Sequence, residues 1–294
     1  MIRRFYELVT DFYEFAWGSS FHFAPTRNGA SFEESIVSHQ YFLADALALS
    51  PGMKVLDVGC GVGGPQRSIA KKYRVYVTGL NISEYQLQKC EEYNEKSDLQ
   101  QLCHTLHGDF MAIPAEDETF DVAYHIEAIP HAPDKKGVYD EIFRVLKPGG
   151  FFAGYDWCMT PSYDADCAAH RQIKKDIEFG NALPQIATFT NVNENLQAAG
   201  FELLETRDRA LDADTATPWY SPLEGSVTTL RGFPRSRVGR KLISTLLHAL
   251  EKIRVVPKGT FETCEILNIA ADSLVAGGRL GIFTPMYFHS ARKP

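Results

Sequence analysis

The residues most able to do chemistry begin with a glycine-rich turn that follows an apolar strand. The segment from Val55 to Pro65 reads VLDVGCGVGGP. Its first residues suit a buried parallel strand, and its glycines let a ligand approach the backbone closely. Pro65 opens a helix whose N-terminus would point at that ligand. The segment therefore predicts a nucleotide-type binding site at the end of the strand, and the alternative is a tight turn that binds nothing.

The glycine spacing does not identify the ligand, because Gly59, Gly61 and Gly64 also satisfy the G-x-G-x-x-G pattern of dinucleotide-binding folds. Asp57 favours S-adenosylmethionine (SAM). A carboxylate there would repel a pyrophosphate, whereas it could order the loop and receive the cationic methionine end of SAM. The D-x-G-x-G-x-G order resembles motif I of class I methyltransferases. We expect SAM as cofactor, S-adenosylhomocysteine (SAH) as product, and contacts from Asp57, Gly59, Cys60 and Gly61.

Further cofactor-binding residues are expected at the ends of the next two strands. Asn81 follows the second strand about twenty residues after the turn, where a ribose-binding side chain is expected, and Gln86 lies one helical turn later. Gly108, Asp109 and Phe110 close the third strand. There the carboxylate could accept a hydrogen bond from an adenine amino group while the ring stacks on the base. Asn81 and Asp109 could instead be ordinary capping residues.

Polar side chains also follow the fourth and fifth strands. Glu127 and His131, in the segment HIEAIPH, are spaced to line one wall of the cofactor cleft. The Glu127 carboxylate could face the SAM sulfonium or take a proton, and the His131 imidazole could also take a proton, since it titrates near neutrality. The alternative is that one or both, His131 in particular, are loop residues satisfied by water. Tyr155, Asp156 and Trp157 end the fifth strand and are expected to add a carboxylate and rings to the same rim.

The beginning of the chain is rich in aromatic residues. The segment YEFAWGSSFHF runs from Tyr13 to Phe23. Ring faces stabilise positive charge without acting as nucleophiles, so such a wall suits a site that shelters a carbocation and accepts a flat apolar substrate. The alternative is that these rings only anchor a helix to the core.

Alternating strands and helices must position these residues. We expect strands near 53–58, 74–80, 101–107, 120–126, 150–156, 201–208 and 281–291. We expect helices near 32–49, 64–72, 83–96, 135–146, 163–180 and 190–199, with two more between 211 and 277. The pattern predicts an α/β fold of the class I SAM-methyltransferase type: a Rossmann-like seven-stranded sheet with helices on both faces and a C-terminal helical cap. The expected parts are an aromatic substrate-binding segment (1–50), a SAM-binding core (51–210) and a C-terminal region (211–294).

Composition limits the partners. A net charge of -7 over 294 residues argues against nucleic acid. The six cysteines include no C-x-x-C pair, which predicts reduced thiols and neither disulfides nor a metal site. No segment reaches the apolar length of a membrane span. We expect a protein on the cytosolic side, soluble or peripherally attached to the endoplasmic reticulum or lipid droplets, and the sequence leaves homo-oligomerisation open.

A basic stretch over 231–258 bears on membrane contact. It holds eight Lys and Arg residues around an apolar stripe that contains Leu242, Leu246 and Leu250. A basic amphipathic helix can lie on an anionic membrane surface. The alternative is a cap helix whose stripe is buried.

Taken together, these motifs resemble the sterol C-24 methyltransferase family over nearly the whole chain. YEFAWGSSFHF resembles its aromatic sterol-binding segment, VLDVGCGVGGP its SAM loop, HIEAIPHAP and YDWCMT two further substrate segments, and PWYSPL and GGRLGIFTPMYFHSARKP its C-terminal domain. The resemblance implies SAM-dependent methylation of a Δ24 sterol side chain. The alkene attacks the methyl carbon, a cation forms at C25, a hydride shifts from C24, and a base removes a proton to leave a 24-methylene group.

The resemblance also assigns roles by position. The catalytic residues would be Glu127, His131, Tyr13, Glu14 and Asp156. Of these, Glu127, His131 and Asp156 would be the polar residues nearest the reacting centre, whereas Tyr13 and Glu14 would shape the sterol end. The sterol would contact Tyr13, Trp17, Phe21, His22, Tyr155, Trp157 and Trp219.

Three positions depart from the family pattern. Ala16 replaces glycine, Ile129-Pro130 replaces a Thr-Cys pair, and Asp156 replaces glutamate. The second change alters the substrate wall and could signal another acceptor: the sterol nucleus at C-4, where a 3-keto sterol would react through an enol, or another triterpene. A sterol-binding protein without catalysis is the alternative of a different class. The chain starts close to the aromatic segment, so a longer natural N-terminus could precede it.

Overall fold

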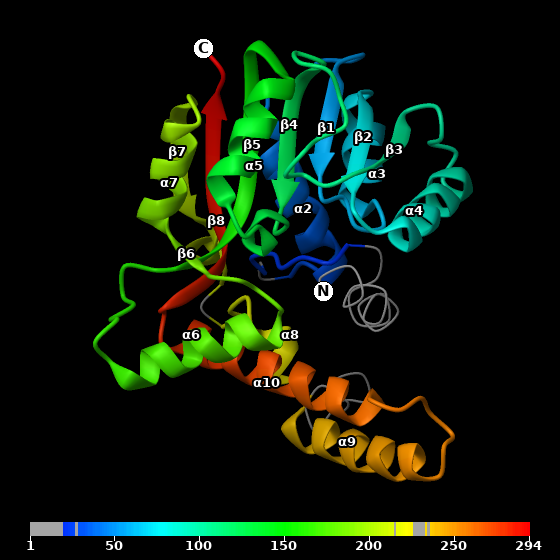
Figure 1. Ribbon diagram of the computed structural model, residues 1–294, viewed down its shortest axis with the longest axis vertical. Helices are drawn as coiled ribbons and strands as arrows, with labels where there is room; N and C mark the ends of the chain where they lie inside the picture. The colour runs from blue at the N-terminus through cyan, green and yellow to red at the C-terminus, as the bar shows by residue number, and fades with distance from the viewer. Residues whose placement is uncertain (1–19, 27–28, 215, 226–232, 234–235) are drawn as a thin grey trace.

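A mixed β-sheet runs through the molecule, whose computed structural model describes residues 20–26, 29–214, 216–225, 233 and 236–294 (Figure 1). Within these residues seven strands follow the order β3-β2-β1-β4-β5-β8-β7, and an eighth, two-residue strand pairs with β5. The strands are β1 Lys54–Val58, β2 Tyr76–Asn81, β3 Cys103–His107, β4 Phe120–Ile126, β5 Leu146–Met159, β6 Ala187–Thr188, β7 Glu202–Asp208 and β8 Phe283–Arg292. Strand β8 is antiparallel to both neighbours, and the path from β3 to β5 is parallel.

Helices cover both faces of the sheet (Figure 1). They are α2 Phe32–Asp45, α3 Gly64–Tyr73, α4 Glu84–Lys96, α5 Lys135–Val145 and α7 Phe189–Ala198. Helices α2 and α3 bury one face around Val55 and Tyr124, and α5 and α7 bury the other around Leu56 and Phe152. Val55 and Leu56 enter different cores because successive side chains of a strand point to opposite faces. This alternation decides which strand residues can reach the site.

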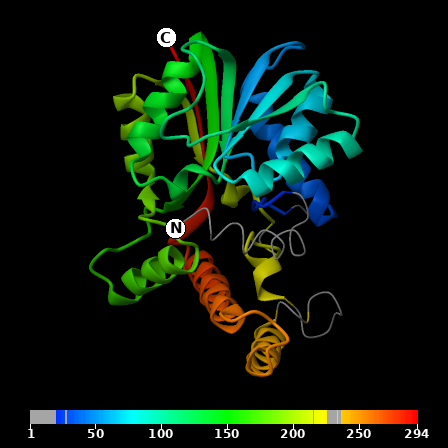
Figure 2. The ribbon, with the colours of Figure 1, turned by 45° about the vertical axis from the view of Figure 1, so that its right-hand side comes forward.

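Further helices form a cap beyond the carboxyl ends of the parallel strands (Figures 1 and 2). They are α6 Ala168–Gly180, α8 Ser221–Glu224, α9 Arg237–Lys252 and α10 Thr260–Arg279, with short 3-10 helices at Ile129–His131 and Arg209–Asp212. Gly180 lets α6 and α10 pack closely, since a Cβ there would lie 2.7 Å from the Cα of Ala270. Helix α9 packs on α10 at the end of the cap far from the sheet.

The predicted α/β architecture is confirmed, with differences at the ends of elements. Strand β5 starts at Leu146, before the expected 150, because a register shift beside β4 lets residues 146–150 join the strand. Helix α6 starts at Ala168, five residues after the expected 163, because a turn precedes it. Among the described helices, none combines the length and the apolar content that a bilayer crossing requires.

Candidate active site

The glycine turn joins the end of β1 to the start of α3. Gly59, Gly61 and Gly63 have φ angles of 79°, 56° and 78°, in the left-handed region that favours glycine. The backbone N–H groups of Gly59 and Cys60 donate to the carbonyl of Leu80 at 2.9 and 3.0 Å. These bonds fasten the turn to β2 and leave the N-terminus of α3 at the carboxyl edge of the sheet.

The glycines of the turn differ in how much space the surrounding residues leave for a side chain. A Cβ on Gly59 would lie 2.4 Å from the Cβ of Ala128, so that glycine is needed for close packing against the end of β4. Among the described residues, a Cβ on Gly61 would meet only the ring of Phe21, at 3.8 Å. Gly61 is thus approachable, and the aromatic segment lies next to it. The Cys60 thiol is buried and contacts the Gly61 carbonyl at 3.6 Å.

Asn81 ends β2 against the glycine turn. Its Nδ2 donates to the Gly61 carbonyl at 3.3 Å and to Oε1 of Gln86 at 2.8 Å, while its Oδ1 accepts from the Ser83 N–H at 3.2 Å. Both amide side chains are buried. Asn81 therefore orders the start of α4 and also touches the turn, and its contact with a ribose stays a prediction.

Asp57 is buried at the end of β1. Its Oδ2 accepts a hydrogen bond from the hydroxyl of Tyr124 at 2.8 Å. Burial raises the pKa of Asp57 to about 7, although the Tyr124 bond lowers it. The carboxylate thus orders the strand end through Tyr124, and direct contact with the methionine end of SAM stays a prediction.

The three residues after β3 lie in a short loop. A Cβ on Gly108 would lie 2.6 Å from the ring of Pro114, so this glycine allows a close turn. Asp109 is exposed and accepts from the Met111 N–H at 2.9 Å, a loop-capping bond. Phe110 is half-buried against the core beneath α5. Contacts of Asp109 and Phe110 with adenine stay predictions.

Glu127 connects three parts of the site. It follows β4 with a left-handed φ of 57°, unusual for a residue other than glycine. Its Oε1 accepts from the backbone N–H of Phe23 at 2.7 Å, and its Oε2 accepts from Nε1 of Trp157 at 2.8 Å. Burial raises the pKa of Glu127 to about 8, against the effect of these two bonds. A carboxylate of raised pKa, held by two fixed donors, lies beside the glycine turn.

An aromatic cluster surrounds Phe23. Its ring lies 5.1 Å from the ring of Trp219, edge-on, and 6.0 Å from that of Trp157. Phe283 adds a ring 5.5 Å from Trp157. Two predicted substrate residues, Trp157 and Trp219, are therefore brought together from β5 and the cap. Phe23, which joins them, was not among the predicted site residues.

Two predicted histidines flank the residues described above in the chain: His22 precedes Phe23, and His131 ends the 3-10 helix that follows Glu127. His22 is buried; its Nδ1–H donates to the Phe23 carbonyl at 2.8 Å and its Nε2 accepts from the Gln40 amide at 2.9 Å. Burial lowers its pKa to about 4. His131 has a pKa lowered to about 4 by burial and by the charge of Lys135. Both imidazoles are thus neutral near pH 7. His22 holds segment 20–24 on α2, and its contact with a sterol stays a prediction.

The structure corrects the expectation that Tyr155, Asp156 and Trp157 share one rim. Tyr155 lies under α2, where it stacks on His39 at 3.7 Å between ring centroids and donates to the His39 carbonyl. Asp156 faces the opposite side of the sheet and is buried beneath α5. Only Trp157 reaches the rim. The reason is the alternation of strand side chains, which separates position 156 from 155 and 157.

Three predicted residues lie outside the described part of the chain: Tyr13, Glu14 and Trp17. Sequence reasoning missed Phe23 and Tyr124, which bond to Glu127 and Asp57. The segment FHF gave a signal for Phe23, whereas the Tyr124 partner depends on the β1–β4 pairing.

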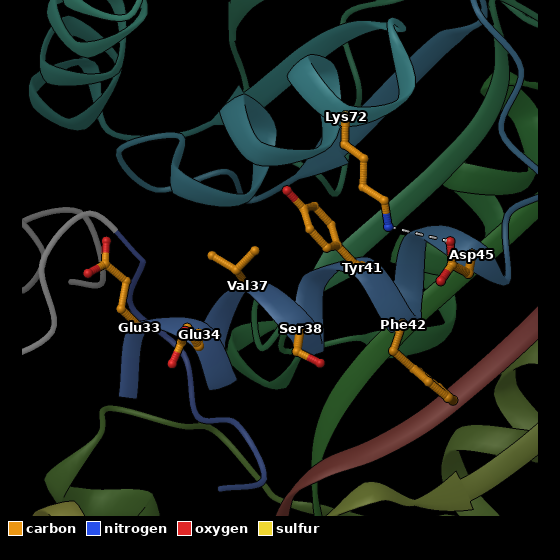
Figure 3. Close-up of a pocket in the computed structure, with 8 residues that line it drawn as sticks. All are labelled: Glu33, Glu34, Val37, Ser38, Tyr41, Phe42, Asp45 and Lys72. Carbon is orange, nitrogen blue, oxygen red and sulfur yellow. Dashed lines mark ion pairs between the residues drawn. The ribbon is translucent and has the colours of Figure 1, made fainter. Parts of the chain in front are cut away.

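A groove of about 590 Å³ lies elsewhere, along the outside of α2 (Figure 3). Lys72 lies over the ring of Tyr41 and pairs with Asp45 at 3.9 Å. None of the predicted site residues that the structure describes lines it, so it is separate from the described part of the candidate active site.

The residues at the sheet edge fit SAM. Gly61 leaves the backbone open, Asn81 offers a buried amide beside it, and Glu127 offers a carboxylate close to the turn. Amide and carboxylate groups suit the hydroxyls and the positive charges of SAM.

Comparison with known proteins agrees with this reading. The chain matches the methyltransferase domain family over residues 56–154 and the sterol methyltransferase C-terminal family over residues 230–294. A cycloartenol-C-24-methyltransferase of Arabidopsis thaliana is 47% identical, covering 100% of this chain and 87% of that protein. A sterol 24-C-methyltransferase of Gibberella zeae is 44% identical, covering 100% and 79%. A mycolic acid cyclopropane synthase crystallised with SAH and CTAB has the same fold, with a TM-score of 0.73 at 18% identity, covering 99% and 97%.

The sheet order, the glycine turn and the residues beside it define a class I SAM-dependent methyltransferase. SAM is its cofactor. Because relatives above 40% identity match the whole chain, the protein belongs to the sterol C-24 methyltransferase family.

Proposed function

We propose that this enzyme transfers a methyl group from SAM to C-24 of a Δ24 sterol side chain. The observation that carries the proposal is the Glu127 bridge, which ties the aromatic segment at Phe23 to the ring of Trp157 beside the glycine turn. A ring-lined site suits a flat apolar acceptor, and a carboxylate there suits a reaction that builds positive charge. The names of the relatives favour C-24 over the sterol nucleus.

The chain's own residues would act by positioning and by charge. SAM, when bound, supplies the electrophilic methyl group. Phe23, Trp157 and Trp219 would exclude water and face a developing side-chain cation with their rings. Glu127 would stabilise that cation as an anion and accept the proton that leaves it. His131, neutral at pH 7, is the second candidate for that proton.

Labelled methyl transfer tests the proposal. The purified enzyme is given SAM with a labelled methyl group and, separately, zymosterol, cycloartenol and a 3-keto sterol, and the product position is determined. We expect label in a 24-methylene side chain. Label at C-4 of the 3-keto sterol alone would move the reaction to the nucleus. Sterol binding with no label in any sterol would instead indicate a binding protein.

The pH dependence follows from the raised pKa of Glu127. With a pKa of about 8 in the free enzyme, Glu127 is mostly protonated at pH 7, and both of its proposed roles need the anion. We expect kcat/KM to rise with pH and to level off above an inflection near 8. The positive charge of SAM favours the anion, so the inflection in kcat is expected at lower pH. A flat profile from pH 6 to 9 would contradict this assignment.

We also propose peripheral contact of α9 with a sterol-bearing membrane on the cytosolic side. Leu242 and Leu246 are 57% and 58% exposed, so this part of the stripe is not buried against the described residues. Val238, one turn earlier, extends the same ridge at 55% exposed. Lys241 is exposed beside it, whereas Arg240 is paired with Asp272 of α10. An apolar ridge with neighbouring cations fits an anionic lipid surface.

Vesicle binding tests this contact. We expect Leu242→Glu with Leu246→Glu to weaken binding to phosphatidylcholine–phosphatidylserine vesicles about tenfold or more, because two exposed leucines that would enter the lipid are replaced by charges. The matched control, Leu204→Glu with Leu211→Glu, changes two exposed leucines outside α9. Equal binding by both double variants in a flotation assay would refute the role of α9.

A further inference from the structure

Three ionisable side chains meet on the face of the sheet that α5 covers. Nε2 of His125 lies 3.2 Å from Nε2 of His289, and Oδ2 of Asp156 lies 3.5 and 3.3 Å from these two nitrogens. All three residues are at most 1% exposed. They lie on the opposite side of the sheet from Trp157, so the proposed methyl transfer does not use them.

Strand pairing brings these residues together. His125 of β4 is opposite Gly154 of β5, and Gly154 is opposite His289 of β8. A Cβ on Gly154 would lie 2.1 Å from Nε2 of His125 and 2.9 Å from Nε2 of His289. The missing side chain is what lets both imidazoles reach over the central strand. Asp156, two residues along β5, points to the same face.

We propose that His125, Asp156 and His289 form a binding site for a divalent transition-metal ion, with zinc favoured. Ligand atoms around a tetrahedral ion with bonds of about 2.0–2.1 Å lie about 3.3–3.4 Å apart. The three distances between the ligand atoms, 3.2, 3.3 and 3.5 Å, match that spacing. Charge-assisted N–H···O bonds are shorter, about 2.7–2.9 Å, so the two contacts to the carboxylate are long for hydrogen bonds alone.

The residues around the three ligands indicate how tightly the site would hold an ion. The hydroxyl of Tyr139 donates to Oδ2 of Asp156 at 3.2 Å and orients the carboxylate. The ring of Phe152 lies 5.7 and 5.2 Å from the two imidazole rings, so an apolar side chain packs against both of them. Nδ1 of His125 and of His289 has no hydrogen-bond partner in the described structure. Because such partners strengthen metal sites, we expect an exchangeable ion that joins β4, β5 and β8.

Metal titration of the full chain tests the site without reference to activity. Protein stripped with a chelator is titrated with Co²⁺, followed by visible absorption, and with Zn²⁺, followed by bound metal and melting temperature. We expect one equivalent per chain, the absorption of tetrahedral cobalt and a higher melting temperature with zinc. A wild-type protein that binds neither ion would overturn the proposal and leave a metal-free hydrogen-bonded cluster.

Variants locate the ion. Asp156→Asn keeps the shape and removes the charge, and His289→Phe keeps a ring and removes the nitrogen; each should weaken cobalt binding at least tenfold. His104→Ala, at an exposed histidine of β3, is the matched control and should bind cobalt normally. Circular dichroism checks folding, and if one variant does not fold the other serves. Wild-type cobalt affinity in a folded Asp156→Asn or His289→Phe variant would place the ion elsewhere and refute the site.

Discussion

Replacing Glu127 by glutamine should lower kcat about 10²–10⁴-fold, the range expected for loss of a general base. The wild-type carboxylate accepts two hydrogen bonds, from the Phe23 N–H and from the Trp157 indole. Glutamine has the same size but carries no charge, and its one carbonyl oxygen can satisfy only one of the two donors. The variant therefore loses the anion and loosens the link to the aromatic segment. Turnover of labelled SAM under saturating sterol measures the effect.

The matched control is Glu178→Gln. Glu178 is a partly buried carboxylate of α6 that accepts from the Ile186 N–H at 2.9 Å and pairs with Lys174. It should keep normal turnover, which separates loss of a catalytic carboxylate from a general cost of removing a buried charge. The pH inflection near 8 should also disappear in Glu127→Gln. Normal turnover by a folded Glu127→Gln protein would remove Glu127 from the catalytic residues.

Gly59→Ala should reduce the affinity for SAM tenfold or more. The new Cβ would lie 2.4 Å from the Cβ of Ala128, and the φ of 79° strains any side chain. Overpacking costs about 1–3 kcal/mol and the left-handed backbone about 1 kcal/mol more. Relief of the clash would move the turn away from the end of β4, where Glu127 lies. Calorimetric titration with SAM and thermal melting measure the two effects.

Two further variants distinguish the backbone strain at a positive φ from the steric clash with Ala128. Gly52→Ala has a similar φ of 86° but no atom of the described residues within 4 Å of its new Cβ, so it should cost only the backbone strain and leave SAM affinity unchanged. Gly59→Ala combined with Ala128→Gly removes the partner of the collision and should recover much of the SAM affinity. If the double variant is as weak as Gly59→Ala alone, close packing against Ala128 is not the cause.

Local patterns in the sequence determined the elements that carry cofactor chemistry. The glycine turn, the strand before it and the helix start at Pro65 lie within eleven consecutive residues, and their short-range geometry leaves few alternatives. The same holds for the alternation of strands and helices that predicted the sheet. The alternation of side chains along β5 also separates Asp156 from Tyr155 and Trp157, because residues two positions apart in a strand share a face of the sheet.

Only the tertiary structure decided which distant residues meet. His125 and His289 are 164 positions apart, and their contact depends on strand order, register and the missing Cβ of Gly154. Cysteine spacing, on which the expectation of no metal rested, carries no information about such a cluster. The bond between Glu127 and Phe23 likewise joins residues 104 positions apart. The physical reason is that a sequence fixes periodicity over a few residues, whereas contacts across a sheet depend on how whole strands are ordered and aligned.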